Sequence, residues 1–251
     1  MRTTQVVDKN RVAQRFAKAQ SRYRQAAVVQ SNMARQLIWW AAALGMQPCD
    51  RLLEIGCGDG LLTRLLPGQQ HHWLNDLYQH SSLADYRAQW LLGDIEHIRL
   101  PEHLSVIVSN AVWQWVHDVP TLLSRCVAAL QSGGWLCLTT FAPANMREIK
   151  ALTGCGLSYP SLAQWHGWLE NAGLDVLLLR EERQTLLFDD ALAVLRHLQH
   201  TGVTATSADF QWSKRRLAQF VRDYAVLARQ HGWQNAYPLS YQPLYLVARK
   251  P

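Results

Sequence analysis

The sequence predicts an α/β protein built on a mostly parallel sheet, with strands and helices alternating along the chain. Three observations lead to this fold class. Short apolar runs of strand length recur between segments with helical periodicity. A glycine-rich turn directly follows the first run, at residues 56–60. Polar residues end several later runs, which is where parallel sheets bind their ligands.

Composition bounds the class of protein. The 251 residues are 49% hydrophobic and 18% charged, which suits one large folded domain. The longest apolar run, residues 37–46, is too short to span a membrane, and the first twelve residues contain no signal-peptide core. Five cysteines without a CxxC pair favour reduced thiols and a cytoplasmic location. The net charge of +6 suits nucleic acid, an anionic membrane or an acidic protein, without choosing among them.

The elements are predicted from changes of hydrophobic period. Residues 10–44 form a helix, because apolar side chains recur there at helical spacing with basic ones around them. The apolar positions are Val12, Phe16, Ala19 and Tyr23, and the basic ones are Arg11, Arg15, Lys18 and Arg22. Strands are expected at 51–55, 72–74, 90–92, 105–109 and 135–140, with helices at 61–66 (closed by Pro67-Gly68) and 122–130.

The second half of the chain repeats this alternation less regularly. Helices are expected at 161–172, 189–200 and 214–231, and strands at 174–179, extendable to 188, and at 244–249. The two helices before the last strand form an insertion that could cover a site.

The glycine turn has the pattern E-x-G-x-G-x-G, from Glu54 to Gly60. A dinucleotide-binding turn has the pattern G-x-G-x-x-G/A, whose third small residue packs helix on strand. Leu61 occupies that position, so the sequence disfavours a pyrophosphate ligand. A tight turn without any ligand is the alternative interpretation.

This pattern resembles the first motif of the class I S-adenosylmethionine-dependent methyltransferases. The resemblance implies that the glycines admit the amino-acid part of the cofactor and that Glu54 faces the same end. Asp76, 22 residues after Glu54, would accept hydrogen bonds from the ribose hydroxyls, although a turn or cap role is the alternative. Asp94 would accept from the adenine amino group, and Ile95 would pack on the ring.

The end of the fourth strand, Ser109-Asn110-Ala111, would line the floor near the sulfonium. It lacks the Asn/Asp-Pro-Pro-Tyr/Phe signature of enzymes that methylate exocyclic amino groups of bases, which argues against that activity. The predicted cofactor-binding residues are Glu54, Gly56, Cys57, Gly58, Asp76, Leu77, Asp94, Ile95, Ser109 and Asn110.

A narrower resemblance covers nearly the whole chain. Six stretches, RFAKAQSRYRQAAVVQ, GDIEHIRL, SNAVWQWVHD, LTTFAPANMREIK, FDDALAVLRHLQHTGVTA and YPLSYQPLYLVARK, resemble the BioC family, the malonyl-[acyl-carrier protein] O-methyltransferases of biotin synthesis. The resemblance implies a Rossmann-like seven-stranded sheet with helices on both faces, an N-terminal helical cap and a helical insertion. Glu54 stands where Asp is common, and residues 151–159 look shorter than the corresponding loop of some relatives.

The resemblance also implies a domain plan and a reaction. Residues 1–251 would form a single methyltransferase domain. It would comprise a helical segment (1–46), a cofactor-binding half (47–141) and a substrate-side half (142–251) with its insertion at about 188–235. The enzyme would methylate the free carboxylate of a malonyl thioester, carried by acyl-carrier protein or by coenzyme A, early in biotin synthesis. S-adenosylmethionine would be the cofactor and S-adenosylhomocysteine its product.

This chemistry needs no general base. A carboxylate, with a pKa near ~4, is already ionised at neutral pH. The sequence contains no Cys/His or Ser/His/Asp pattern and no HExxH metal motif, and we expect no metal. His197 and His200 lie one helical turn apart, which is more typical of a solvated helix face than of a metal pair.

Residues for orienting the acceptor come from the segments that follow strands and from the first helix. Tyr23, Gln114 and Trp115 are the catalytic candidates, with core packing as the alternative for Tyr23. Arg147, Lys150 and Arg183 are candidates for gripping the thioester arm or the partner, with ordinary surface charge as the alternative. A docking face for an acidic carrier protein would draw on Lys150, Arg180, Arg183, Lys214, Arg215 and Arg216.

Three other functions remain open at this stage. They are a methyltransferase for another small molecule, a protein that binds the cofactor without catalysis, and an RNA methyltransferase suggested by charge alone. The sequence shows no basic-aromatic array that would support RNA binding. We therefore expect no binding to nucleic acid. We also expect the protein to be a monomer that does not bind membranes.

Overall fold

The computed structural model describes residues 8–66, 71–202 and 212–251, with the side chains of residues 18–21 left out. The expected helix stop at Pro67-Gly68 and the end of the family stretch, residues 203–205, lie outside the described residues. The chain divides into two compact units. Unit 1 comprises Met1–Ala27, Pro143–Tyr159 and Glu182–Gln242, and unit 2 comprises Val28–Ala142, Pro160–Glu181 and Pro243–Pro251.

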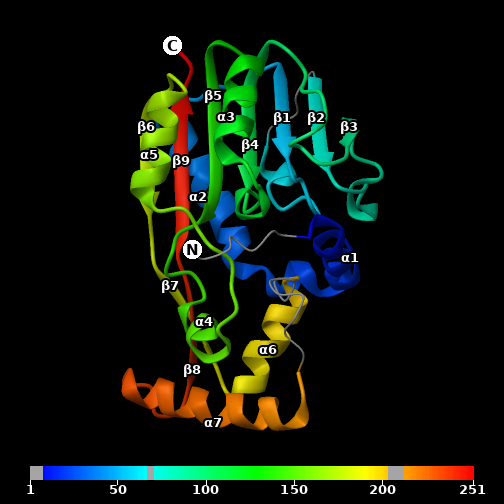
Figure 1. Ribbon diagram of the computed structural model, residues 1–251. Helices are drawn as coiled ribbons and strands as arrows, with labels where there is room; N and C mark the ends of the chain where they lie inside the picture. Colours follow the sequence, from blue (N-terminus) through cyan, green and yellow to red (C-terminus); the bar gives the residue numbers. More distant parts are fainter. Residues whose placement is uncertain (1–7, 67–70, 203–211) are drawn as a thin grey trace. The chain divides into compact units, whose positions relative to one another are not determined.

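Unit 2 contains a seven-stranded sheet in the order β3-β2-β1-β4-β5-β9-β6 (Figure 1). Its strands are β1 (Arg51–Ile55), β2 (His71–Asp76), β3 (Gln89–Leu92), β4 (Leu104–Asn110), β5 (Leu130–Phe141), β6 (Asp175–Glu181) and β9 (Pro243–Arg249). The first five are parallel, and β9 runs antiparallel to β5 and β6. The predicted, mostly parallel seven-stranded sheet is confirmed. Strand order reverses between β1 and β4, so their carboxyl ends flank the usual ligand position of such sheets.

Helices cover both faces of this sheet, as predicted. They are α2 (Val28–Ala43), α3 (Val119–Ala129) and α5 (Leu162–Asn171). Short 3₁₀ turns follow three of the strands: η1 (Thr63–Leu65) follows β1, η2 (Ser81–Leu83) follows β2, and η3 (Trp113–Trp115) follows β4. Successive strand residues point to opposite faces. Leu52 therefore packs in a cluster with Leu37 of α2. Its neighbour Leu53 packs in another cluster with Leu123 of α3 and Leu169 of α5.

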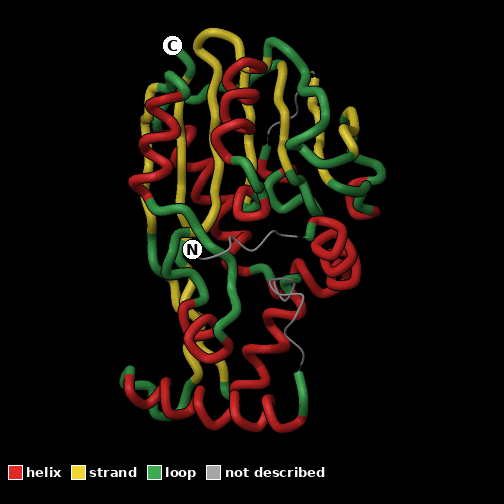
Figure 2. The backbone as a smooth tube through the Cα atoms, in the orientation of Figure 1, coloured by secondary structure: helices red, strands yellow, loops and turns green. Residues whose placement is uncertain are grey.

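Unit 1 is mainly helical, with one small sheet (Figure 2). It contains α1 (Lys9–Ala26), α4 (Arg147–Thr153), α6 (Ala191–His200) and α7 (Lys214–Gln230), and the antiparallel pair β7 (Gln184–Phe188) and β8 (Tyr237–Tyr241). Side-chain caps start two of the helices: Asp190 accepts from the Ala193 N–H at 2.6 Å, and Ser213 accepts from the Arg216 N–H at 3.2 Å.

Several predicted elements were wrong in extent. The strand expected at 135–140 begins earlier, at Leu130. The single helix at 10–44 is two helices, α1 and α2, which break at the buried Ala27, where neither Gly nor Pro marks the sequence. The helix expected at 61–66 is only the 3₁₀ turn η1. The possible long strand at 174–188 is interrupted at Glu182 and Arg183, because β6 pairs with β9 and β7 pairs with β8.

Two elements were missed. β8 contains Pro238, whose backbone nitrogen has no hydrogen to donate to a neighbouring strand. A proline within a short run argues against a strand, so the sequence pattern did not predict β8. α4 has only seven residues and begins after Met146, which adopts a left-handed conformation (φ 52°). Neither segment has the length or the periodicity that sequence patterns need.

Candidate active site

The glycine turn lies at the carboxyl end of β1, in unit 2. Gly56 and Gly58 both have positive φ, 67° and 54°. A Cβ on Gly56 would lie 2.3 Å from Val112 Cγ2, so the protein itself requires glycine there. A Cβ on Gly58 would meet no atom of the described residues within 4 Å. The backbone at Gly58 therefore faces open space, as a loop that admits a ligand should.

Asp76 ties this turn to the end of β2. Its Oδ2 accepts from the Gly58 N–H at 2.8 Å, and its Oδ1 accepts from the Leu77 N–H at 2.7 Å. His80 Nε2 lies 3.5 Å from Oδ2. A carboxylate has about four acceptor positions, so Asp76 keeps capacity for hydroxyl donors.

Glu54, the first residue of the turn motif, lies in β1 and is buried, with a raised pKa. Burial raises the pKa of Glu54 to about 8, a rise that the neighbouring Thr63 partly offsets. Its Oε2 has no hydrogen-bond partner among the described residues, and His72 Nε2 lies 3.8 Å away. Burial lowers the pKa of His72 to about 4, so the imidazole is neutral at pH 7 and supplies no charge. An orphaned carboxyl oxygen beside an open glycine loop suits a cationic ligand group such as an α-ammonium.

Arg64 holds the turn from the other side. Its Nη1 donates to the carbonyls of Asp59 (2.5 Å) and Gly60 (2.9 Å), and its Nη2 donates to the carbonyl of Ser82 (2.8 Å). The sequence prediction missed this residue. Its position four residues after Gly60, one helical turn on, was the available signal.

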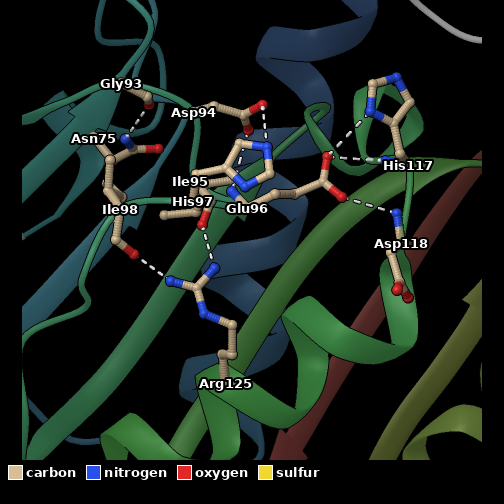
Figure 3. Close-up of polar contacts among 10 residues, drawn as sticks. All are labelled: Asn75, Gly93, Asp94, Ile95, Glu96, His97, Ile98, His117, Asp118 and Arg125. Atoms are coloured by element: carbon tan, nitrogen blue, oxygen red, sulfur yellow. Dashed lines mark hydrogen bonds and ion pairs between the residues drawn. The ribbon is translucent and has the colours of Figure 1, made fainter.

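The loop after β3 carries the predicted adenine residues (Figure 3). Asn75 Nδ2 donates to the carbonyls of Leu91 (2.8 Å) and Gly93 (3.0 Å), which anchors the loop to the end of β2. Asp94 Oδ1 accepts from the Glu96 N–H at 3.1 Å, and Ile95 is buried.

Two charged side chains attach this loop to the segment that enters α3 (Figure 3). Glu96 accepts from the N–H groups of His117 (3.0 Å) and Asp118 (2.8 Å). Arg125, from α3, donates to the carbonyls of Ile95 (2.7 Å) and Ile98. Arg125 was also missed, because it reaches back about thirty residues and no local pattern marks it.

At the carboxyl end of β4, one hydroxyl and two side-chain amides form hydrogen bonds with neighbouring segments. Ser109 Oγ is buried and donates to the carbonyl of Ile55 at 2.9 Å, which links β4 to β1. Asn110 Nδ2 donates to the carbonyl of Gln30 at 3.1 Å. Gln114 Nε2 donates to the carbonyl of Ala111 at 2.6 Å, and Gln114 Oε1 accepts from Thr140 at 3.2 Å. Trp115 is buried in the following 3₁₀ turn.

The remaining candidates belong to unit 1. Tyr23 is half-buried on α1, with its ring edge-to-face with Phe16 at 5.7 Å. Arg147 is exposed, and its Nε donates to the buried Glu148 at 3.1 Å. Lys150 and Arg183 are exposed.

The ten predicted cofactor-binding residues thus gather at the carboxyl edge of the unit 2 sheet, together with Gln114 and Trp115. The open glycine loop, the orphaned Glu54 oxygen and the two anchored carboxylates fit the predicted cofactor. Within the described residues, no cluster of His, Cys, Asp and Glu could hold a metal ion, and no helix is long and apolar enough to cross a membrane.

Comparisons with known proteins show which family the chain is similar to. A family model described as a methyltransferase domain matches residues 13–179. The malonyl-[acyl-carrier protein] O-methyltransferase of Acinetobacter baylyi is 42% identical, covering 97% of this chain and 98% of its own. The protein of the same name from Haemophilus influenzae is 35% identical, covering 97% and 95%.

Similar solved structures support the fold alone. The YcgJ protein of Bacillus subtilis has a TM-score of 0.59 at 15% identity, covering 86% of this chain and 98% of that one. The cyclase SpnF has a TM-score of 0.52 at 17% identity, covering 87% and 80%. Since a cyclase shares the fold, the fold by itself does not fix the reaction.

Proposed function

The chain belongs to the malonyl-[acyl-carrier protein] O-methyltransferase family of S-adenosylmethionine-dependent methyltransferases, and we propose that its methyl acceptor is the free carboxylate of a malonyl thioester. The observation that carries this proposal is the 42% identity to a relative of that name over almost the full length of both chains. The relative's name favours acyl-carrier protein over coenzyme A as the carrier. The product, a malonyl methyl ester, would enter biotin synthesis.

We propose that different unit 2 residues bind different parts of the cofactor. Asp76 would accept from the ribose hydroxyls while its backbone bonds keep the carboxylate in place. Asp94 would accept from the adenine amino group, against the buried side chain of Ile95. Glu54 would pair with the α-ammonium, which supplies the cation that the buried carboxyl lacks.

For this reaction the protein must mainly position the reacting atoms, and it need not transfer a proton. When bound, the cofactor supplies an electrophilic methyl group on a sulfonium. The acceptor is an ionised carboxylate at neutral pH and needs no base. Opposite charges disappear as the carboxylate oxygen bonds to the methyl carbon and the carbon–sulfur bond breaks, so a dry site favours the transfer. Holding the reacting atoms in line supplies much of the remaining acceleration.

The same burial protects the enzyme from its own cofactor. Cys57 lies inside the glycine turn, where a thiolate would compete for the methyl group. Burial, and next the neighbouring carboxylates, raise the pKa of Cys57 far above neutral, which keeps the sulfur as an unreactive thiol.

We keep the other candidates as parts of this proposal. Tyr23, Gln114 and Trp115 would orient the acceptor through neutral groups, which leave the carboxylate nucleophilic. Arg147, Lys150 and Arg183 would contact the thioester arm or its carrier. The enzyme would act as a cytoplasmic monomer, without nucleic acid or membrane.

The test is methyl transfer from methyl-labelled S-adenosylmethionine to malonyl-acyl-carrier protein, with malonyl-coenzyme A and RNA in parallel. We expect label on malonyl-acyl-carrier protein, released as methanol by mild alkali, as esters are. Succinyl-acyl-carrier protein, longer by one methylene, is the matched control for acceptor length. Label on RNA, or no transfer to any malonyl thioester, would contradict the proposal.

A further inference from the structure

Among the helices, α1 carries the largest net positive charge, and α7, with five basic residues and one Asp, carries the next largest. The chain has 25 basic and 19 acidic residues. Helix α1 contains six of the basic ones and no Asp or Glu, so the rest of the chain carries 19 of each and is neutral. The six are Lys9, Arg11, Arg15, Lys18, Arg22 and Arg24. The nearest acid in sequence, Asp8, caps the helix by accepting from the Arg11 N–H at 3.1 Å.

Three of these residues lie on one face of α1. Arg11, Arg15 and Arg22 are spaced by four and seven residues, which places them in one row of an α-helix. At about 1.5 Å per residue the row is about 16 Å long. We call these three residues the α1 basic row. A row of this length suits several anions spaced along a partner surface and is too long for a single phosphate or carboxylate.

Contacts within unit 1 hold the rest of α1 in place. Val12 is buried, and the Phe16 ring lies against the backbone of Gly202, where an added Cβ would come within 3.1 Å of Phe16 Cδ1. Arg22 Nη1 lies 3.3 Å from His200 Nε2 on α6. The α1 basic row follows the side of the helix adjacent to this apolar contact, with Arg11 and Arg15 half-exposed and Arg22 exposed.

Two members of the α1 basic row, Arg11 and Arg15, lie close enough to repel each other. Burial lowers the pKa of Arg15, and the neighbouring charge of Arg11 lowers it further. Like charges kept this close are relieved when an anionic surface binds over them.

We propose that the α1 basic row is the docking surface for the acidic carrier protein that presents the malonyl group. This proposal rests on the proposed function and adds to it the surface that recognises the partner. Acyl-carrier proteins are acidic, and their charge complements α1, which has the largest net positive charge of the helices and contains no Asp or Glu. The docking helix differs from the surface predicted from sequence, which had drawn on residues such as Lys214 and Arg215 of α7.

The test compares acceptors with and without the carrier. The variant replaces Arg11, Arg15 and Arg22 by Gln, which removes the charge and keeps a polar side chain of similar helix propensity. KM and kcat are measured for malonyl-acyl-carrier protein, malonyl-coenzyme A and malonyl-pantetheine at several salt concentrations. A matched control carries Gln in place of three exposed arginines elsewhere, Arg35, Arg87 and Arg229.

We expect the KM for malonyl-acyl-carrier protein to rise by about tenfold in the basic-row variant, with a weaker dependence on salt, because surface charges act mainly on association. The kcat at saturation and the KM for malonyl-pantetheine should stay within about twofold of wild type, which also shows that the variant folds. The control variant should behave as wild type with all three acceptors.

Each contrary result has a distinct meaning. An unchanged KM for malonyl-acyl-carrier protein, or an equal rise in the control variant, overturns the docking proposal. So does a rise confined to malonyl-coenzyme A, which would make the row a nucleotide-phosphate site, or an equal loss with malonyl-pantetheine. A wild-type enzyme that transfers no methyl to malonyl thioesters overturns the proposed function itself.

Discussion

Glu54 is the residue whose ionisation the cofactor should change. Its pKa of about 8 makes the carboxyl mostly neutral at pH 7, whereas a bound ammonium favours the carboxylate. Binding should therefore release a proton, and affinity for S-adenosylmethionine should rise with pH. We expect Kd to fall by about tenfold from about pH 6 to about pH 7.5, and to rise again above about pH 8, where the α-ammonium itself loses its proton. Calorimetry in buffers of different ionisation enthalpy measures both the Kd and the released proton.

Glu54→Gln is the control for this prediction. The amide keeps the shape of the side chain but cannot ionise, so the fall in Kd and the proton release should both disappear. An unchanged pH profile in Glu54→Gln would show that another group titrates.

The same residue should make the folded protein less stable as pH rises. Its pKa is higher in the folded protein than the ordinary value of 4.5, so above that value the unfolded chain loses the proton first. The free energy of unfolding then falls between about pH 4.5 and about pH 8. Without cofactor, Glu54→Gln should raise Tm by about 3 °C near pH 8 and leave it almost unchanged near pH 5. Calorimetric melting curves at both pH values check this, and an equal Tm shift at the two would contradict it.

At the scale of the element, the glycine turn can be tested against a second turn of the same geometry. Gly58 and Gly173 both have positive φ (54° and 71°), and at both an added Cβ would meet no atom of the described residues within 4 Å. Alanine should cost each site about 1 kcal/mol of stability from backbone strain. Only Gly58→Ala should also weaken S-adenosylmethionine binding, by about tenfold or more, because its methyl group occupies the open space. Equal loss of affinity in Gly173→Ala would assign the effect to strain.

The loop after β3 depends on a helix that the sequence does not associate with it. Arg125 holds two carbonyls of this loop, so Arg125→Met should loosen Asp94 and raise the KM for S-adenosylmethionine by about tenfold, with a smaller change in kcat. Lysine keeps the charge but lacks the planar fork of the guanidinium, so it should rescue binding only in part.

A purely structural role for Arg125 would leave base recognition intact. We expect the preference for adenosine over inosine to shrink in Arg125→Met, because inosine lacks the amino group that Asp94 is proposed to bind. Competition binding of the two nucleosides measures this ratio, with Arg35→Met on the exposed face of α2 as control. A retained preference would remove Arg125 from adenine positioning.

At the scale of the whole molecule, the sequence predicted features that depend on local patterns and missed those that depend on long-range contacts. Gly56, Asp76 and Asp94 were predictable because each lies at a strand end, where topology alone places it at the ligand edge. Arg64 and Arg125 were not, because they act on backbone carbonyls, which carry no sequence signature. The break at Ala27 and the pairing of β7 with β8 depend on tertiary packing that overrides local propensity.

The two units also predict where each ligand protects the backbone from hydrogen exchange. All proposed cofactor residues belong to unit 2, so S-adenosylmethionine alone should slow exchange in the loops at 56–60, 76–77 and 93–97. Malonyl-acyl-carrier protein should add protection along residues 11–22 of α1, and malonyl-pantetheine should not. Exchange followed by mass spectrometry measures both effects on one sample. Carrier-protein protection that falls on α7 and spares α1 would contradict the docking surface, because it would place the carrier on the other basic helix.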